Sequence, residues 1–173
     1  MAEIIRVYRQ KVGALRFVGK KYGDNDRVDG MFGAKWEDWH TNGLFNAIEK
    51  QINGNQKEIY EDGDAYIGLM RFKENEPFEY WIGMFMPTNM AVPDGYECVN
   101  FPESELGVCW VYGKDGEVYM EEERCADRLR KEGFEVITDE KGAYWFFERY
   151  GCPRFTEPDE KGNIILDVCH YIK

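Results

Sequence analysis

The sequence predicts an α+β protein built from two fused β-β-α-β-β repeats. Segments rich in β-branched and aromatic residues, typical of strands, flank a segment with helical periodicity, and this order occurs twice. A loop with two prolines, Pro87–Gly95, separates the two occurrences. EYWIGMFM at Glu79–Met86 and AYWFFERY at Ala143–Tyr150 each contain a Tyr-Trp pair, which supports a duplication. Chance is the alternative explanation, because 16% of the residues are aromatic.

The first repeat is expected at about residues 1–88, with four strands and one helix. Its predicted strands are Ile4–Val12, Ala14–Tyr22, Asp64–Lys73 and Glu79–Met86. Its predicted helix is Trp36–Ile52, in which Trp36, Trp39, Leu44, Phe45, Ile48 and Ile52 fall roughly on one stripe. Gly43 weakens this helix, and Asn53-Gly54 ends it.

The second repeat is expected at about residues 95–173 and has the same order. Its predicted strands are Tyr96–Phe101, Leu106–Tyr112, Ala143–Tyr150 and Asn163–Ile172, and its predicted helix is Val118–Lys131. Neither repeat has enough residues to bury a helix and a sheet comfortably alone. We therefore expect a single domain over residues 1–173.

The composition limits the partners of the protein. The formal net charge is −11, whereas binding to the phosphate backbone of nucleic acid needs a basic surface, so we expect no direct contact with nucleic acid. No apolar stretch approaches the length of a membrane span. The charged N-terminus MAEIIRVYRQ lacks the apolar run of a signal peptide. These features predict a cytoplasmic protein without membrane contact.

The cysteines and histidines do not form a metal-binding pattern. The five cysteines, at 98, 109, 125, 152 and 169, are widely spaced and include no CxxC pair. The two histidines, His40 and His170, are far apart and belong to no HxxxH or HExxH pattern. We expect reduced thiols, no disulfide, no metal and no cofactor.

A single acid, Glu148, lies in the most aromatic stretch of the chain, AYWFFERYGCPRF at Ala143–Phe155. In a strand, side chains alternate between faces, so Glu148 shares a face with Tyr144, Phe146 and Tyr150. A carboxylate among aromatic rings loses hydration energy unless a positive or hydrogen-bonding group meets it. This pattern fits a pocket for a bulky aromatic cation with Glu148 as counter-ion, or a core strand whose glutamate pairs with Arg149 or reaches water.

Two regions together resemble the GyrI-like superfamily, the effector-binding domains of AraC- and MerR-type regulators. They are EYWIGMFM...VPDGYECVNFPESELGVCWVYG and WFFERYGCPRF...GNIILDVCHYI, and the resemblance extends over nearly all 173 residues. The chain departs from the family pattern at Cys109, where a tyrosine is common, and in the last strand, which lacks the usual proline.

The resemblance implies concave antiparallel sheets around a central ligand cavity. Members of the family bind lipophilic cationic drugs there, and the position of their usual counter-ion corresponds to Glu148. Some standalone members hydrolyse cyclopropane-bearing genotoxins, with the same acid assisting the attack of water, and others bind gyrase. No helix-turn-helix precedes Ile4, so the resemblance implies a standalone sensor domain without a DNA reader.

We expect the ligand-binding residues to be one acid and the aromatic residues around it, although a single large aromatic residue more often fills a core. They are Glu148, Tyr144, Phe146, Tyr150, Tyr80, Trp110, Tyr112 and Trp39. The first functional hypothesis is a small-molecule binder of lipophilic cations. A hydrolase of reactive electrophiles, with Glu148 as general base, is the second. The third is an acidic protein-interaction module that uses the runs at 121–123 and 157–160.

Overall fold

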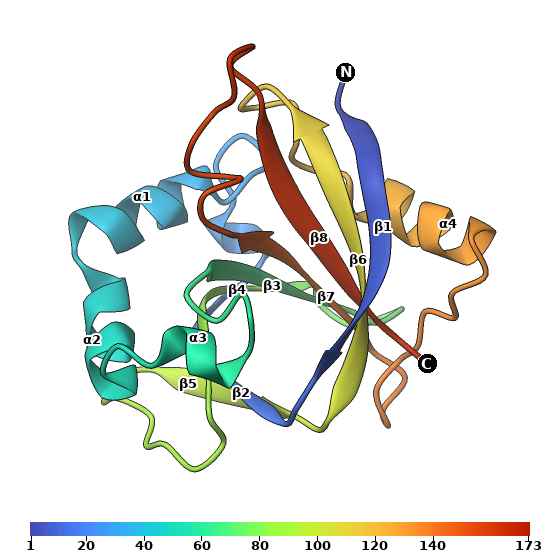
Figure 1. The fold of residues 1–173 in the computed structure, drawn as a ribbon. Coiled ribbons are helices and arrows are strands. Elements are labelled where there is room, and N and C mark those ends of the chain that lie inside the picture. The colour runs from blue at the N-terminus through green and yellow to red at the C-terminus, as the bar shows by residue number, and fades with distance from the viewer.

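The computed structural model describes residues 1–173 and confirms the α+β class (Figure 1). The strands are β1 (Glu3–Val12), β2 (Leu15–Tyr22), β3 (Tyr66–Phe72), β4 (Glu79–Met86), β5 (Glu97–Phe101), β6 (Ser104–Gly113), β7 (Tyr144–Tyr150) and β8 (Ile164–Ile172). The helices are α1 (Gly33–Thr41), α2 (Leu44–Ile52), α3 (Gln56–Ile59) and α4 (Glu122–Lys131). A short 3-10 turn covers Asp24–Asp26.

All eight strands form one antiparallel sheet in the order β1-β6-β8-β7-β3-β4-β2-β5. If β1 to β4 are exchanged with β5 to β8, the order reads the same from the opposite edge, so the topology has a two-fold between β3 and β7. Each repeat also gives its first strand to the other, because β1 pairs with β6 and β5 pairs with β2. The pairing of β3 with β7 joins the two halves into one continuous sheet.

This topology corrects the strand equivalence expected from the Tyr-Trp pairs. The counterpart of β7 is β3, and the counterpart of β4 is β8, so the strands Glu79–Met86 and Ala143–Tyr150 are not equivalent. Short aromatic runs fit any buried strand and therefore do not identify a particular one. The true counterpart, β3, has the sequence YIGLMRF, which contains no acid, so the carboxylate of Glu148 still belongs to one repeat alone.

Both predicted helices differ from the observed ones. The segment Trp36–Ile52 is divided into α1 and α2 because Gly43 has a φ of 62°, a left-handed conformation that ends one helix and starts the next turn. The helix predicted from Val118 begins at Glu122, because Met120 has a φ of 62° and cannot belong to a right-handed helix.

The long helices lie on one face of the sheet, on either side of its middle. Figure 1 shows α1 and α2 beside one half of the fold and α4 beside the other. Two clusters of buried apolar side chains attach these helices to the sheet. The first cluster packs α1 and α2 against the first repeat through Trp39, Phe45, Ile48, Ile52, Ile82 and Met84. The second packs α4 against the second repeat through Cys125, Leu129, Cys109, Val111 and Val168. The strands β3 and β7 lie between these two groups of packing contacts.

The opposite face of the sheet is buried in a core that both repeats share. This cluster has 14 buried residues, among them Phe17, Phe85, Phe147 and Tyr171. Side-chain alternation along β7 follows the predicted pattern, because Phe147 belongs to this core whereas Glu148 points to the helix-bearing face. None of the helices is both long and apolar enough to cross a lipid bilayer.

Candidate functional site

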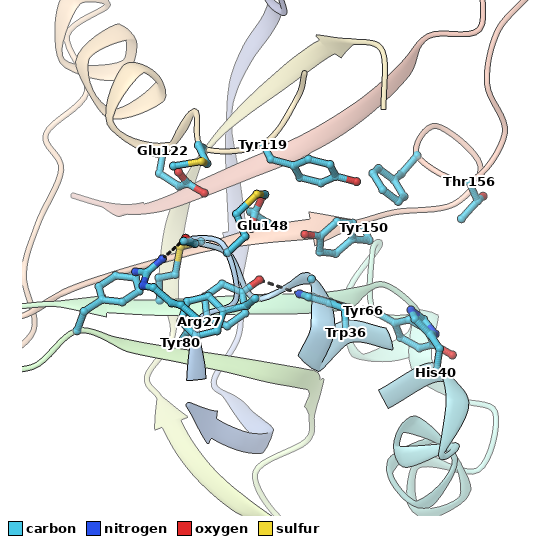
Figure 2. A pocket seen from close by; sticks show the side chains of 18 of the residues that line it. Arg27, Trp36, His40, Tyr66, Tyr80, Tyr119, Glu122, Glu148, Tyr150 and Thr156 are labelled. Carbon is cyan, nitrogen blue, oxygen red and sulfur yellow. Dashed lines mark hydrogen bonds between the residues drawn. The ribbon is translucent and has the colours of Figure 1, made fainter. Parts of the chain in front are cut away.

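A cavity of about 870 Å³ lies on the helix-bearing face where the two repeats meet (Figure 2). Its floor is formed by side chains of β3, β4 and β7. One wall comes from the segment 27–33 with α1 and α2, and the other from residues 119–123 and 152–156. The space between α1–α2 and α4 is therefore large enough to hold a small-molecule ligand, and most of the residues that line it are hydrophobic.

Glu148 lies at the floor of this cavity, and its side chain is only 5% exposed. Its cross-strand neighbour on β3 is Gly68, which has no side chain to cover the carboxyl group. A Cβ atom at Gly68 would lie 2.6 Å from the hydroxyl oxygen of Tyr80 and 3.3 Å from a ring carbon of Trp36. The glycine therefore makes room for two of the aromatic side chains that surround the acid.

The aromatic side chains around Glu148 hold one another in place. The indole N–H of Trp36 donates a hydrogen bond to the hydroxyl of Tyr80 at 2.8 Å, drawn in Figure 2. Tyr80 also stacks on Phe32 with ring centroids 4.2 Å apart. The ring of Tyr150 packs edge-on against Trp36, with centroids 4.7 Å apart. Residues from three separate elements thus form a preorganised aromatic surface.

The carboxyl group of Glu148 has a strongly perturbed acidity. Burial raises its pKa well above the usual value, and the negative charge of Glu122 raises it further. The nearby hydroxyls of Tyr150 and Tyr80 lower the pKa and offset only part of this effect. No basic residue contributes to the stabilisation of its charged form. The carboxylate therefore lacks the positive partner that buried charges normally have.

Other carboxylates also line the cavity, whereas basic side chains are scarce. The acids are Glu49, Asp64, Glu122, Glu123 and Glu148, and the only lysine or arginine is Arg27. Arg27 is already paired, because its Nε donates to Asp24 at 2.8 Å and its guanidinium lies over the ring of Phe32 at 4.6 Å. Burial raises the pKa of Glu122 as well. The cavity is consequently suited to a positively charged occupant.

Met120 is an unusual wall residue. It is 72% exposed and has a left-handed backbone, which is uncommon for a residue other than glycine. Met31, on the facing wall, is also an exposed large apolar side chain. Exposed flexible methionines at a cavity adapt to ligands of different shapes. Strained backbone also concentrates at ligand sites, so both features of Met120 are consistent with a binding role.

The structure divides the sequence-predicted site residues into three groups. Glu148, Tyr150 and Tyr80 lie together in the main cavity. Tyr144 and Phe146 point to the same face of β7 but line a smaller, adjoining cavity. A strand rises about 3.3 Å per residue, so one strand face can extend from one cavity into the next.

The remaining three predicted residues, Trp39, Trp110 and Tyr112, do not line either cavity. Trp39 is completely buried in the core beneath α1, where its indole N–H donates to the Tyr22 hydroxyl at 2.8 Å. Trp110 packs against the shared core on the opposite face of the sheet, with Tyr8. Tyr112 has the same strand parity as Trp110 and bonds to Asp159. Because side chains alternate along β6, both residues point to the face of the sheet opposite Glu148.

Several lining residues were not predicted, most importantly Trp36, Tyr119 and Glu122. Trp36 lies one helical turn before Trp39, and the stripe of apolar residues did not distinguish the residue that faces the cavity from the one that faces the core. The sequence places Glu122 in the acidic run 121–123 and on one face of the predicted helix with Cys125 and Leu129, but it does not identify Glu122 as a site residue. Its half-buried position in the cavity wall depends on where α4 begins, and the sequence did not predict this start. No group of three or more His, Cys, Asp or Glu side chains is arranged to hold a metal ion.

No protein-family model matches the chain, and no curated protein matches its sequence. Solved structures do match its fold. SAV2435 bound to tetraphenylphosphonium superposes with a TM-score of 0.68 at 16% identity, over 98% of this chain and 94% of that one. A candidate bacterial transcription regulation protein from Staphylococcus aureus MU50 gives a TM-score of 0.64 at 15% identity, over 97% and 98% of the two chains.

A hydrolase from Listeria innocua is also similar, with a TM-score of 0.52 at 10% identity, over 97% of this chain and 92% of that one. At such identities the likeness establishes the fold alone. It is consistent with the GyrI-like fold that the sequence resemblance implies.

Proposed function

We propose that the protein binds bulky, lipophilic aromatic cations in the main cavity and acts as an effector-binding domain. The observation that carries this proposal is Glu148, a buried carboxyl group among aromatic rings with no basic residue beside it. A cation would supply the missing positive partner. Tetraphenylphosphonium, the ligand of the similarly folded SAV2435, belongs to this chemical class.

The expected energetics favour a large aromatic cation over a small one. A cation over an aromatic face gains roughly 0.5–2 kcal/mol. Burial of apolar ligand surface adds about 25 cal/mol per Å² before the cost of association. A small hydrated ion would gain only the charge interaction and would lose its hydration. The rings of Trp36, Tyr80 and Tyr150 therefore select for lipophilic ligands, and Glu148 selects for positive charge.

The test is titration calorimetry with tetraphenylphosphonium at neutral pH. Glu148→Gln keeps the side-chain volume and removes the charge, so affinity should fall by about 1.5–3 kcal/mol, the size of a charge–charge interaction over about 5–10 Å at an effective dielectric constant of about 20. This corresponds to roughly 10- to 150-fold in Kd. Glu74→Gln, at an exposed position outside the cavity, is the matched control and should bind like the parent protein. Equal affinities of the parent protein and Glu148→Gln would contradict the proposal.

Hydrolysis of reactive electrophiles is a second candidate, favoured by the raised pKa of Glu148 and by the hydroxyls of Tyr80 and Tyr150 beside it. A carboxyl group with a raised pKa can accept a proton from water near neutral pH. Incubation with a cyclopropane-bearing electrophile, followed by mass spectrometry, should detect addition of water. The Glu148→Gln variant should reduce turnover by roughly 10²- to 10⁴-fold. Binding without any product would leave the protein as a binder only.

A further inference from the structure

A second cavity of about 460 Å³ lies between α4 and the helix-bearing face of β3, β7 and β8. It shares four lining residues with the main cavity, Met70, Phe78, Glu122 and Glu123. The two spaces are therefore neighbours across a common boundary, with a carboxylate, Glu122, at that boundary. We call this second space the side chamber.

The floor of the side chamber is aromatic and uncharged. Phe146 and His170 are cross-strand neighbours, and their rings stack with centroids 5.3 Å apart and planes 14° apart. His170 is only 4% exposed, and burial, with a smaller effect from Arg130, lowers its pKa to about 4. The imidazole is thus neutral at physiological pH. Its Nδ1 is buried without a hydrogen-bond partner, and the ring stacked on Phe146 lines the floor.

The rim of the side chamber is apolar on one side and acidic on the other. Phe72 is 48% exposed, one of the few large apolar side chains that the fold leaves open to solvent. The basic residue at the rim, Arg130, is paired with Asp127 at 3.3 Å. Glu122 and Glu123 have no salt-bridge partner among the ion pairs of the structure. A ligand that enters from the main cavity therefore passes unpaired carboxylates and then reaches aromatic surface.

We propose that the side chamber is a subsite for a second aromatic group of the ligand, so that the complete site takes elongated cations with an aromatic group at each end. The cationic head occupies the main cavity beside Glu148, and the distal ring packs on Phe146 and His170. Glu122, at the shared boundary, keeps this passage favourable for a positively charged molecule. The inference rests on the proposed function, because it extends the same cation site.

Two probes with the same head test this subsite by calorimetry. They are methyltriphenylphosphonium and (4-phenylbutyl)triphenylphosphonium, which differ in a tail that ends in a phenyl ring. Burial of a phenylalanine-sized side chain stabilises by about 1.5–3 kcal/mol, so the parent protein should bind the tailed probe roughly 10- to 150-fold more tightly. No gain from the tail in the parent protein would overturn the proposal.

Variants then locate the ring of the tail. Ala126→Leu fills the side chamber from α4, where Ala126 lines this space but not the main cavity. The gain from the tail should fall below about 3-fold, while binding of methyltriphenylphosphonium stays unchanged. Lys131→Leu, an exposed position on the same helix, adds the same side chain outside the chamber and should keep the full gain. A full gain in Ala126→Leu would place the tail elsewhere and overturn the proposal.

A second variant guards against a folding defect in Ala126→Leu. Phe146→Leu removes the stacked ring from the chamber floor and leaves an apolar side chain of similar size. It should reduce the gain from the tail several-fold without affecting the methyl probe. A failure of the proposed function would look different from a failure of the subsite. If the proposed function were wrong, methyltriphenylphosphonium itself would not bind, or it would bind equally well to Glu148→Gln.

Discussion

At the scale of single residues, Glu148 and Glu122 form an acidic pair that the fold places in one cavity. Burial and the charge of Glu122 both raise the pKa of Glu148. Two nearby carboxyl groups without a cation cannot both ionise at low cost. Binding of a cation should therefore favour loss of a proton from this pair.

The same pair should make stability depend on pH. The pKa of Glu148 is raised in the folded state, so its protonated form stabilises the fold below about pH 4.5, the usual pKa of a glutamate, and this stabilisation is lost as pH rises toward the raised pKa. Glu148→Gln removes the effect. Its free energy of unfolding should match that of the parent protein in acid and exceed it increasingly above pH 4.5, by up to about 1.4 kcal/mol per pH unit.

Urea unfolding at a series of pH values measures this difference. Glu74→Gln, at an exposed position, should show no such divergence from the parent protein. A difference between Glu148→Gln and the parent protein that is constant with pH would show that the carboxyl group has an ordinary acidity in the fold.

Sequence alternation was sufficient to place Glu148 on a face with Tyr150, but not to choose the aromatic residues across from it. Trp110 and Tyr112 come from β6, and their face relative to Glu148 depends on how several strands pair in the sheet. Trp39 and Trp36 differ by one helical turn, and only the packing of α1 decides which of them meets the core. Residues on one strand were thus predictable together, whereas residues from different elements were not.

At the scale of elements, the break between α1 and α2 lets both helices contribute to the same cavity wall. Trp36 lines the cavity from α1, and Glu49 lines it from α2. Glycine content alone suggested a weakened continuous helix. The left-handed φ of Gly43 depends on how both helices pack on the sheet, which a helical pattern does not reveal.

A continuous helix over Trp36–Ile52 and two helices separated at Gly43 predict opposite effects of Gly43→Ala on stability. In a continuous helix, alanine would stabilise by about 1 kcal/mol. At a φ of 62°, the substitution should instead destabilise by about 1 kcal/mol, because a Cβ atom strains the left-handed conformation. Urea unfolding gives the sign. Gly33→Ala, in an open position at the start of α1, is the control and should be neutral or stabilising.

At the scale of the whole molecule, a buried ion network on the face opposite the cavity connects distant segments. Arg149 and Asp167 are both 0% exposed, and their side chains bond at 2.8 Å between β7 and β8. Arg154, in the loop after β7, donates to Asp167 at 2.7 Å and to Asp62 at 2.8 Å. Since this loop also supplies cavity residues such as Phe155, the network holds one wall of the site.

Asp167→Asn should therefore destabilise the fold by about 3–5 kcal/mol, because it leaves buried arginine charge without its main partner. The free energy of unfolding in urea measures this loss. Asp94→Asn makes the same chemical change at an exposed position and should alter stability by less than about 0.5 kcal/mol. A similarly small effect at Asp167 would mean that the network does not hold the loop.

The repeat order was predictable from the sequence, whereas the exchange of first strands between repeats was not. Strand-like patterns identify which segments are strands, but neighbours in the sheet depend on long-range pairing, as for β1 with β6. The cavity lies over the β3–β7 pairing in the middle of the sheet, between α1–α2 and α4. Its acid could be identified from the sequence, and its full lining could not.

The most direct test of cation recognition by Glu148 compares two ligands of the same shape and opposite charge. Tetraphenylphosphonium and tetraphenylborate should be titrated into the parent protein and into Glu148→Gln under identical conditions. We predict that the parent protein binds the phosphonium far more tightly, and that Glu148→Gln reduces this preference at least 10-fold, on the scale of a lost charge–charge interaction. An unchanged preference in Glu148→Gln, or equal binding of both ions by the parent protein, would contradict the role of Glu148 as the counter-ion.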